Sequence, residues 1–178
     1  MKKPEHEVIL QPGEFHFGDA NMRIRTLLGS CVSITMWHPT RLIGGMCHYM
    51  LPSRNAKQLN ELDGRYADEA ILLLFQEAVR HNTNPKDYIV KVFGAGNMFP
   101  DLAGRISEKN DAGRISVPRK NAEIIRTLAS AYGFAIEAHD LGGTGHRNIV
   151  FDIRSGHVWV RQVKAMGSAE TGALLEKN

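Results

Sequence analysis

Two segments of the chain carry apolar residues at helical spacing. Residues 66–80 place an apolar stripe on one face of a helix, formed by Ala67, Ala70, Ile71, Leu74, Phe75 and Ala78. A second stripe runs from about Asn121 to Tyr132, and Gly133 is placed to end that helix. The pattern therefore predicts two main helices.

The remaining apolar residues alternate with polar ones or form short β-branched runs, which is typical of strands. The clearest hairpin joins RNIVFDI (147–153) to HVWVRQV (157–163) through Arg154-Ser155-Gly156. The other expected strands are 22–28, 31–37, 42–50, 87–94 and 134–140. Because strands and helices do not alternate regularly, the fold class is predicted to be α+β, with a sheet or paired sheets and helices to one side.

The size and composition of the chain limit its organisation. With 178 residues and 43% hydrophobic composition, we expect a single domain over residues 1–178. Its ordered core should span about 14–163, because both ends are polar and without pattern, and we expect these termini to be flexible. Neither a membrane-spanning run nor the apolar region of a signal peptide is found, so the sequence predicts a cytoplasmic protein without direct membrane insertion. The two cysteines should be free thiols.

Charge and motif spacing argue against several function classes. The net charge of +3 is spread along the chain without interleaved aromatic residues, so no nucleic-acid partner is expected. The histidines are dispersed, which predicts no metal site. The segment FGAGNMF (93–99) has Gly94-x-Gly96 but lacks the third glycine of a dinucleotide-binding loop, so it is interpreted as a turn beside a site. We expect no cofactor.

A cysteine and a histidine come together if residues 31–37 and 42–50 pair as a hairpin. His38-Pro39-Thr40-Arg41 has the composition of a turn. If His38 and Arg41 face each other across an antiparallel pair, then Cys31 faces His48 directly, with Cβ atoms about 4.5–5.5 Å apart. Strand alternation puts Cys31 and His48 on one face and the more apolar residues, Cys47 among them, on the other.

Such a pair could perform nucleophilic catalysis. A nearby imidazolium would lower the pKa of the Cys31 thiol, and the backbone amides around Gly29-Ser30-Cys31 could stabilise an oxyanion. Taken alone, however, a free cysteine is more often a core residue. A lone histidine is likewise more often a hydrogen-bonded polar residue, and both of these interpretations remain open.

Five segments together resemble the CheD family of chemoreceptor glutamine deamidases. They are LGSCV (28–32), GGMCHYMLP (44–52), KVFGAGNMF (91–99), RKNAEI (119–124) and DLGGTGHRNIVFD (140–152). The resemblance covers roughly residues 14–163. It implies a layered α/β sandwich with mixed, mainly antiparallel sheets. It also implies a bacterial chemotaxis hydrolase that converts glutamine side chains of methyl-accepting chemotaxis receptors to glutamate with release of ammonia.

The resemblance also implies roles for particular residues. Cys31 would be the nucleophile and His48 its base, with Thr26 as a third group or Arg25 in its place. Gly29 and Ser30 would belong to the backbone of the oxyanion site. The chain departs from the family pattern at Pro118 and His146, which we interpret as loop variation.

The implied partners are the cytoplasmic domains of methyl-accepting chemotaxis receptors and a CheC-type phosphatase. Two other functions remain open. The chain could be a non-catalytic chemotaxis regulatory module that binds the receptor or the phosphatase. It could also be a receptor methylesterase, because the same nucleophile would serve that reaction.

Overall fold

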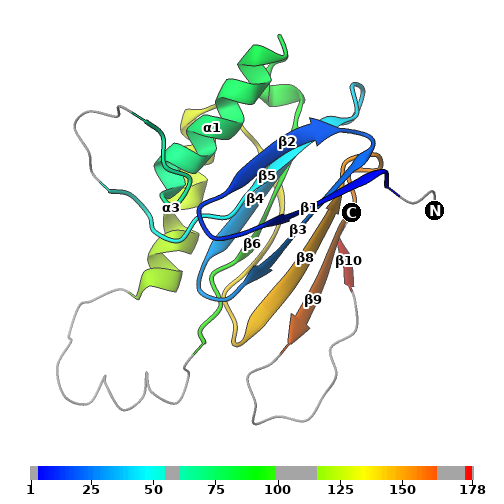
Figure 1. Ribbon diagram of the computed structural model, residues 1–178. Coiled ribbons are helices and arrows are strands. Elements are labelled where there is room, and N and C mark those ends of the chain that lie inside the picture. The colour runs from blue at the N-terminus through cyan, green and yellow to red at the C-terminus, as the bar shows by residue number, and fades with distance from the viewer. Residues whose placement is uncertain (1–3, 55–60, 99–115, 164–174, 178) are drawn as a thin grey trace, which may run out of the picture.

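Two five-stranded sheets pack face to face, and two helices cover the outer face of one of them (Figure 1). The computed structural model describes residues 4–54, 61–98, 116–163 and 175–177. The resulting layers are helices, a sheet that we call sheet B, and an outer sheet that we call sheet A. This arrangement is the α+β layered sandwich that the sequence predicts.

The strands of both sheets are distributed along the whole chain. Sheet A has the order β1 (His6–Leu10), β3 (Met22–Leu28), β8 (His146–Asp152), β9 (Val158–Val163) and β10 (Leu175–Lys177). Sheet B has the order β2 (Phe15–Asp19), β5 (Ile43–Cys47), β4 (Val32–His38), β6 (Ile89–Gly94) and β7 (Ile136–Leu141). The pairs β1–β3 and β6–β7 are parallel and the others antiparallel. The helices are α1 (Ala67–Arg80), a short 3-10 helix (Pro85–Asp87) and α3 (Val117–Ala131).

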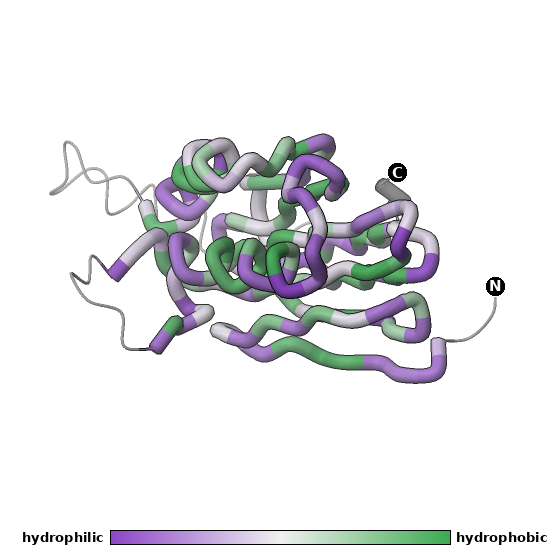
Figure 2. The backbone as a smooth tube through the Cα atoms, turned by 90° about the horizontal axis from the view of Figure 1, so that it is seen from above, coloured by the Kyte–Doolittle hydropathy of each residue, from purple (hydrophilic) through white to green (hydrophobic). Residues whose placement is uncertain are grey.

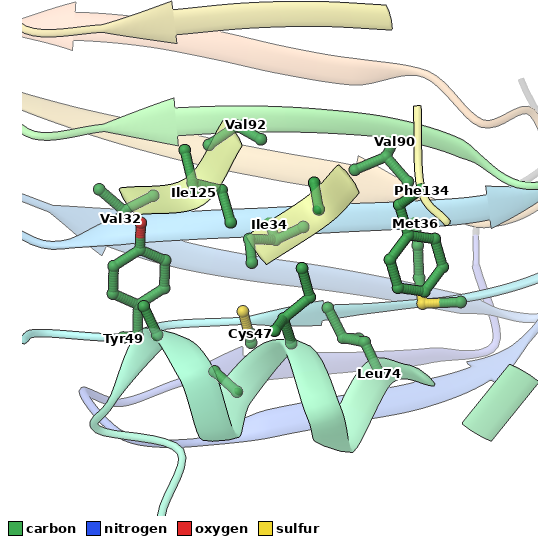
Figure 3. Packing of buried hydrophobic residues seen from close by; sticks show 14 of the residues in the cluster. Val32, Ile34, Met36, Cys47, Tyr49, Leu74, Val90, Val92, Ile125 and Phe134 are labelled. Carbon is green, nitrogen blue, oxygen red and sulfur yellow. The ribbon is translucent and has the colours of Figure 1, made fainter. Parts of the chain in front are cut away.

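Each face of sheet B is covered by a separate hydrophobic core. Figure 3 shows the first core, in which Val32, Ile34 and Met36 of β4 pack against α1 and α3. The second core lies between the sheets and includes Met46 and Phe93. Because β4 is buried on both faces, its polar residues Ser33 and Thr35 are buried as well as its apolar ones. Figure 2 shows hydrophobic and hydrophilic residues interleaved along both the helices and the strands.

The helices and the predicted strands are found at the expected places, with ends that differ from the prediction by up to four residues. The second helix begins at Val117, four residues earlier than predicted, and Pro118 lies in its first turn. Proline suits that position because the amide that it lacks would have no partner within the helix. The interpretation of Pro118 as loop variation is therefore wrong.

Three strands were not predicted from the sequence. They are β1, β2 and β10, and each is an edge strand of its sheet. β1 and β10 fall outside the expected core of 14–163. β1 is mostly exposed, but its last residue, Leu10, is buried between the sheets. The sequence of β1 is polar and without clear alternation because this strand lies at the edge of its sheet. The expectation of flexible ends at residues 1–3, 164–174 and 178 lies outside the described residues.

The hairpin of β4 and β5 has a different register from the one predicted. His38 pairs with Ile43, and Thr35 pairs with Met46, so four residues rather than two form the loop. In this loop Leu42 has a φ of 52°, and its amide donates a hydrogen bond to the His38 carbonyl. A two-residue type I turn twists the strands the wrong way, which favours the longer loop. Because the pairing moves by two residues, the side chains keep their predicted faces.

Candidate active site

Thr26, Cys31 and His48 come from three inner strands, or residues next to them, at one end of the two packed sheets. Thr26 lies on β3 of sheet A, Cys31 directly precedes β4, and His48 directly follows β5. The inward faces of the two sheets carry Thr26 and His48 into the layer between them, where both are buried. The sheet packing therefore joins residues that no single hairpin brings together.

A hydrogen bond across the two sheets sets the protonation pattern of His48. The Thr26 hydroxyl donates to the Leu10 carbonyl at 2.9 Å, so its oxygen is left as an acceptor. His48 Nδ1 lies 2.8 Å from this oxygen and must carry the proton of that hydrogen bond. The tautomer is assigned from this network, and it leaves Nε2 of the neutral ring with a lone pair.

Burial keeps the His48 ring neutral. Loss of solvent lowers the pKa of His48 from 6.5 to about 4, although a hydrogen bond to the Leu10 carbonyl and the Glu14 carboxylate act in the opposite direction. The side chain is 2% exposed. Its Nε2 atom has no hydrogen-bond partner among the described residues. His48 thus presents an unoccupied basic nitrogen.

Cys31 is partly exposed, and its thiol is not activated in the free protein. Burial raises the pKa of the Cys31 thiol, and a hydrogen bond with the Ser30 side chain opposes this effect. In the part of the chain that the structure describes, no hydrogen bond joins the Cys31 sulfur to His48. The expectation of a thiol pKa lowered by an imidazolium is therefore wrong for this state, in which both groups are neutral.

The register explains why Cys31 and His48 are not directly opposed. Val32 exchanges two backbone hydrogen bonds with Tyr49, so Ser33 takes the place opposite His48. Cys31 is then a diagonal neighbour of His48, a relation that typically separates residues by about 7–8 Å. The predicted direct pairing is wrong, but both residues stay on the same face of sheet B, and long side chains can meet across such a diagonal.

The turn that carries Cys31 is held through its carbonyl groups. The amide of Gly96 donates to the Gly29 carbonyl, and the amide of Ala95 donates to the Cys31 carbonyl, both at 2.8 Å. The carbonyl between them, that of Ser30, accepts from the Asn121 side chain at 3.4 Å. Since a peptide carbonyl and the amide of the same unit point in opposite directions, the amides of Ser30 and Cys31 point away from these contacts.

Two glycine-rich loops support this turn from behind. Gly94 has a φ of +120°, and a Cβ atom there would lie 2.2 Å from the Cys31 carbonyl oxygen. The amide of Gly142 donates to the Gly94 carbonyl at 2.9 Å, and that of Asn97 donates to the Gly143 carbonyl at 2.8 Å. These contacts place the end of β6 and the residues after it beside the Cys31 turn.

Other candidate residues lie away from this site. Arg25 is exposed on β3 and forms an ion pair with Glu7 at 3.0 Å, so it does not take the place of Thr26 beside His48. Cys47 is fully buried in the core beneath the helices, and this burial raises the pKa of its thiol to about 12. His146 is half-buried at the start of β8, so it belongs to a strand and not to a loop.

Two buried polar residues near the Cys31 turn were not predicted from the sequence. Asn121 on α3 is fully buried, and it occupies a position of the helical stripe that continues with Ile125 and Ala129. Arg147 on β8 is 2% exposed, and its guanidinium donates to Asp140 and to the carbonyl of Gly142. A polar residue within an apolar stripe is a signal that could have singled out Asn121.

Neither a metal site nor a membrane span is found in the described residues. No three His, Cys, Asp or Glu side chains among them gather closely enough to hold a metal ion. Likewise, none of the described helices is long and apolar enough to cross a membrane.

The fold and site define an α+β protein with a cysteine, a neutral histidine and a threonine at one end of two packed sheets. A family model described as "CheD chemotactic sensory transduction" matches residues 50–162. The chain belongs to the CheD family, as the sequence motifs indicate.

Relatives from several bacteria support this assignment. A protein of Pseudomonas fluorescens (strain SBW25), called "Probable chemoreceptor glutamine deamidase CheD", is 51% identical over 163 residues, which are 90% of this chain and 88% of that protein. The "Probable chemoreceptor glutamine deamidase CheD 2" of Albidiferax ferrireducens is 43% identical over 177 residues, 98% of each chain.

One solved structure is also similar. The crystal structure of Bacillus licheniformis hypothetical protein YfiH matches with a TM-score of 0.45 and 14% identity, covering 73% of this chain and 49% of that one. This value is too low to establish a shared fold.

Proposed function

We propose that this chain is a chemoreceptor glutamine deamidase with Cys31 as its nucleophile. It hydrolyses glutamine side chains of methyl-accepting chemotaxis receptors to glutamate and releases ammonia. The observation that carries this assignment is the hydrogen bond between Thr26 and His48. It leaves His48 Nε2 as a buried basic nitrogen on the face of sheet B that also carries Cys31.

In the first half of the reaction, Cys31 attacks the amide carbon of the substrate. The thiol proton moves to His48 Nε2 as the sulfur–carbon bond forms, which suits the protonated thiol and the neutral imidazole of the free protein. The resulting tetrahedral intermediate collapses when His48 gives this proton to the amide nitrogen. Ammonia leaves, and the glutamyl group remains on Cys31 as a thioester.

In the second half, water hydrolyses the thioester. His48 accepts a proton from the attacking water, whose oxygen adds to the thioester carbon. When the sulfur–carbon bond breaks, the proton returns from His48 to the sulfur, and glutamate is released. Thr26 keeps Nε2 unprotonated at the start of each step, because its oxygen accepts the proton that the ring holds at Nδ1.

Backbone amides are the proposed oxyanion donors. The carbonyls of Gly29, Ser30 and Cys31 are engaged with loop 94–97 and with α3. The amides of Ser30 and Cys31 are then the candidate donors to the developing negative charge, and one such donor typically accounts for about 10²–10³ in kcat. Gly29 keeps the turn compact, because a Cβ there would lie 3.0 Å from the Met98 sulfur.

The family assignment also supports proposals about the partners and organisation of the protein. The substrate partner is the cytoplasmic domain of a chemotaxis receptor, and a CheC-type phosphatase is a second proposed partner. We propose the cytoplasm as its compartment, in keeping with two free cysteines. We further propose that residues 1–178 form a single CheD-like domain, whose core includes β1.

Deamidation of a receptor fragment tests the role of Cys31. The protein is incubated with the cytoplasmic fragment of a Pseudomonas fluorescens chemoreceptor, and mass spectrometry follows each conversion of amide to carboxylate while ammonia is assayed. Cys31→Ala and His48→Asn should abolish conversion, and Cys47→Ala, a matched substitution in the core, should retain it. Full activity of Cys31→Ala would refute the mechanism.

The same assay separates the other two functions. A wild-type protein that binds the fragment but never changes its mass would be a non-catalytic binding module. Release of methanol from a methylated receptor, without loss of ammonia from glutamine, would identify a methylesterase. Either result contradicts the deamidase assignment.

A further inference from the structure

Asn121 is a buried polar residue on the face of α3 that packs onto sheet B. It is fully buried, as are Ile125 and Ala129, which follow at intervals of four residues on the same face. An amide at the start of this apolar stripe costs free energy unless its hydrogen bonds are satisfied. The hydrogen bonds of Asn121 indicate why an asparagine occupies this position.

The Asn121 side chain reaches the chain segments on either side of the site. Its Nδ2 donates to the Met50 carbonyl at 2.7 Å and to the Ser30 carbonyl at 3.4 Å. The Tyr49 hydroxyl donates to the backbone carbonyl of Asn121 at 2.7 Å. Figure 3 shows Tyr49 beside Val32, and these two residues exchange backbone hydrogen bonds. One residue of α3 thus touches the neighbours of both Cys31 and His48.

The contact with Ser30 has a consequence for the Cys31 amide. The Ser30 carbonyl and the Cys31 N–H belong to one planar peptide unit and point in opposite directions. A donor that holds this carbonyl toward α3 therefore holds the N–H toward the opposite side, where the proposed oxyanion develops. The hydrogen bonds of Asn121 in the described part of the chain go to Ser30, Met50 and Tyr49, so its effect on Cys31 acts through the Ser30–Cys31 peptide.

An asparagine amide fits this task for a chemical reason. Its nitrogen carries two protons, one for each carbonyl, without bringing a charge into the core. The opposite orientation of the amide would place its oxygen against two carbonyl oxygens, so the hydrogen bonds determine the assignment. Asn121 Oδ1 is buried without a partner in the described part of the chain, so the amide serves these carbonyls at the expense of an unpaired acceptor.

We propose that Asn121 is a positioning residue that orients the Cys31 amide as an oxyanion donor. This inference rests on the proposed function of the site. Because the oxyanion is absent from the bound substrate and develops only as the tetrahedral intermediate forms, a misoriented Cys31 amide lowers kcat and leaves substrate binding unchanged. It also leaves simple alkylation of the thiol unchanged, since that reaction forms no oxyanion. If Asn121 had a purely structural role, its loss would change kcat, substrate binding and thiol alkylation together, or change none of them.

The test compares Asn121→Ala with Ala129→Gly, a control two turns further along the same buried face. We expect Asn121→Ala to lower kcat on the receptor fragment by about 10–10²-fold. The KM should stay within about threefold of wild type, and the rate of Cys31 alkylation by iodoacetamide within about twofold. Ala129→Gly should lower the thermal midpoint through helix propensity and lost packing. Its kcat should be that of the wild type.

Several outcomes would overturn the inference. The first is an unchanged kcat in Asn121→Ala, and the second is a raised KM of that variant without a change in kcat. The third is an Ala129→Gly variant that has the same thermal midpoint as Asn121→Ala and loses as much kcat. If Asn121→Ala does not fold, Asn121→Ser, which keeps one donor and removes less volume, decides by the same criteria. Activity in Cys31→Ala would reject the proposed function itself, whereas an inactive Cys31→Ala beside a fully active Asn121→Ala rejects only this inference.

Discussion

Acidification should destabilise this protein through His48. Burial lowers the pKa of His48 in the folded state to about 4, whereas an exposed histidine in the unfolded chain has a pKa near 6.5. Between these two values the unfolded chain binds a proton and the folded protein does not. Stability from this group is therefore fully present above about pH 6.5 and is lost as the pH falls toward 4.

The size of the effect follows from the two pKa values. One pKa unit corresponds to about 1.4 kcal/mol, so the full effect is about 3 kcal/mol, of which about 2 kcal/mol is lost between pH 7 and pH 5. This is a large part of the stability of an ordinary domain, which is about 5–15 kcal/mol. Because His48 is 2% exposed, solvent screening does little to reduce it.

Urea unfolding at a series of pH values measures this contribution, with His48→Asn as the comparison. The asparagine amide can still donate to Thr26, but it does not titrate. The free energy of unfolding of the wild type should therefore fall more steeply between pH 7 and pH 5 than that of the variant. Equal slopes, or a wild type that is more stable at pH 5 than at pH 7, would refute the reasoning.

Three further predictions follow from the site and its supports. Thr26→Val should lower kcat by about 10–10²-fold, because the His48 tautomer is no longer set. Thr35→Val removes a buried hydroxyl elsewhere and should leave kcat unchanged, which steady-state kinetics would show. Iodoacetamide should modify Cys31 and spare the fully buried Cys47 in the native protein, as peptide mass mapping would show. Gly94→Ala should destabilise by about 1–3 kcal/mol in urea unfolding, because its Cβ would meet the Cys31 carbonyl.

Local patterns predicted most of the elements and the faces of the central strands. Helical spacing marked both helices, and alternation placed Cys31 with His48 and Cys47 with the core, as the structure confirms. These features depend only on residues that are close in the sequence, so periodicity can reveal them. The predicted faces of these side chains are correct although the predicted β4–β5 register is wrong, since the observed pairing differs by an even number of residues.

Features that depend on distant contacts could not be predicted in this way. β1 was missed because an edge strand that buries little apolar surface has no strong alternation. The four-residue loop after His38 was missed because composition does not distinguish it from a two-residue turn. The family resemblance pointed to Thr26 as a third group, but its contact with His48 depends on how sheet A packs on sheet B.

By itself, the sequence determined the class of fold and the membership of the CheD family, and it supplied the candidate residues for the proposed chemistry. Only the tertiary structure decided the surroundings of these residues, with the His48 proton at Nδ1 and the Ser30 carbonyl bound by Asn121 of α3. The reason is physical. Periodicity describes which side of an element a residue occupies, whereas protonation and orientation depend on desolvation and on partners that packing brings from elsewhere in the chain.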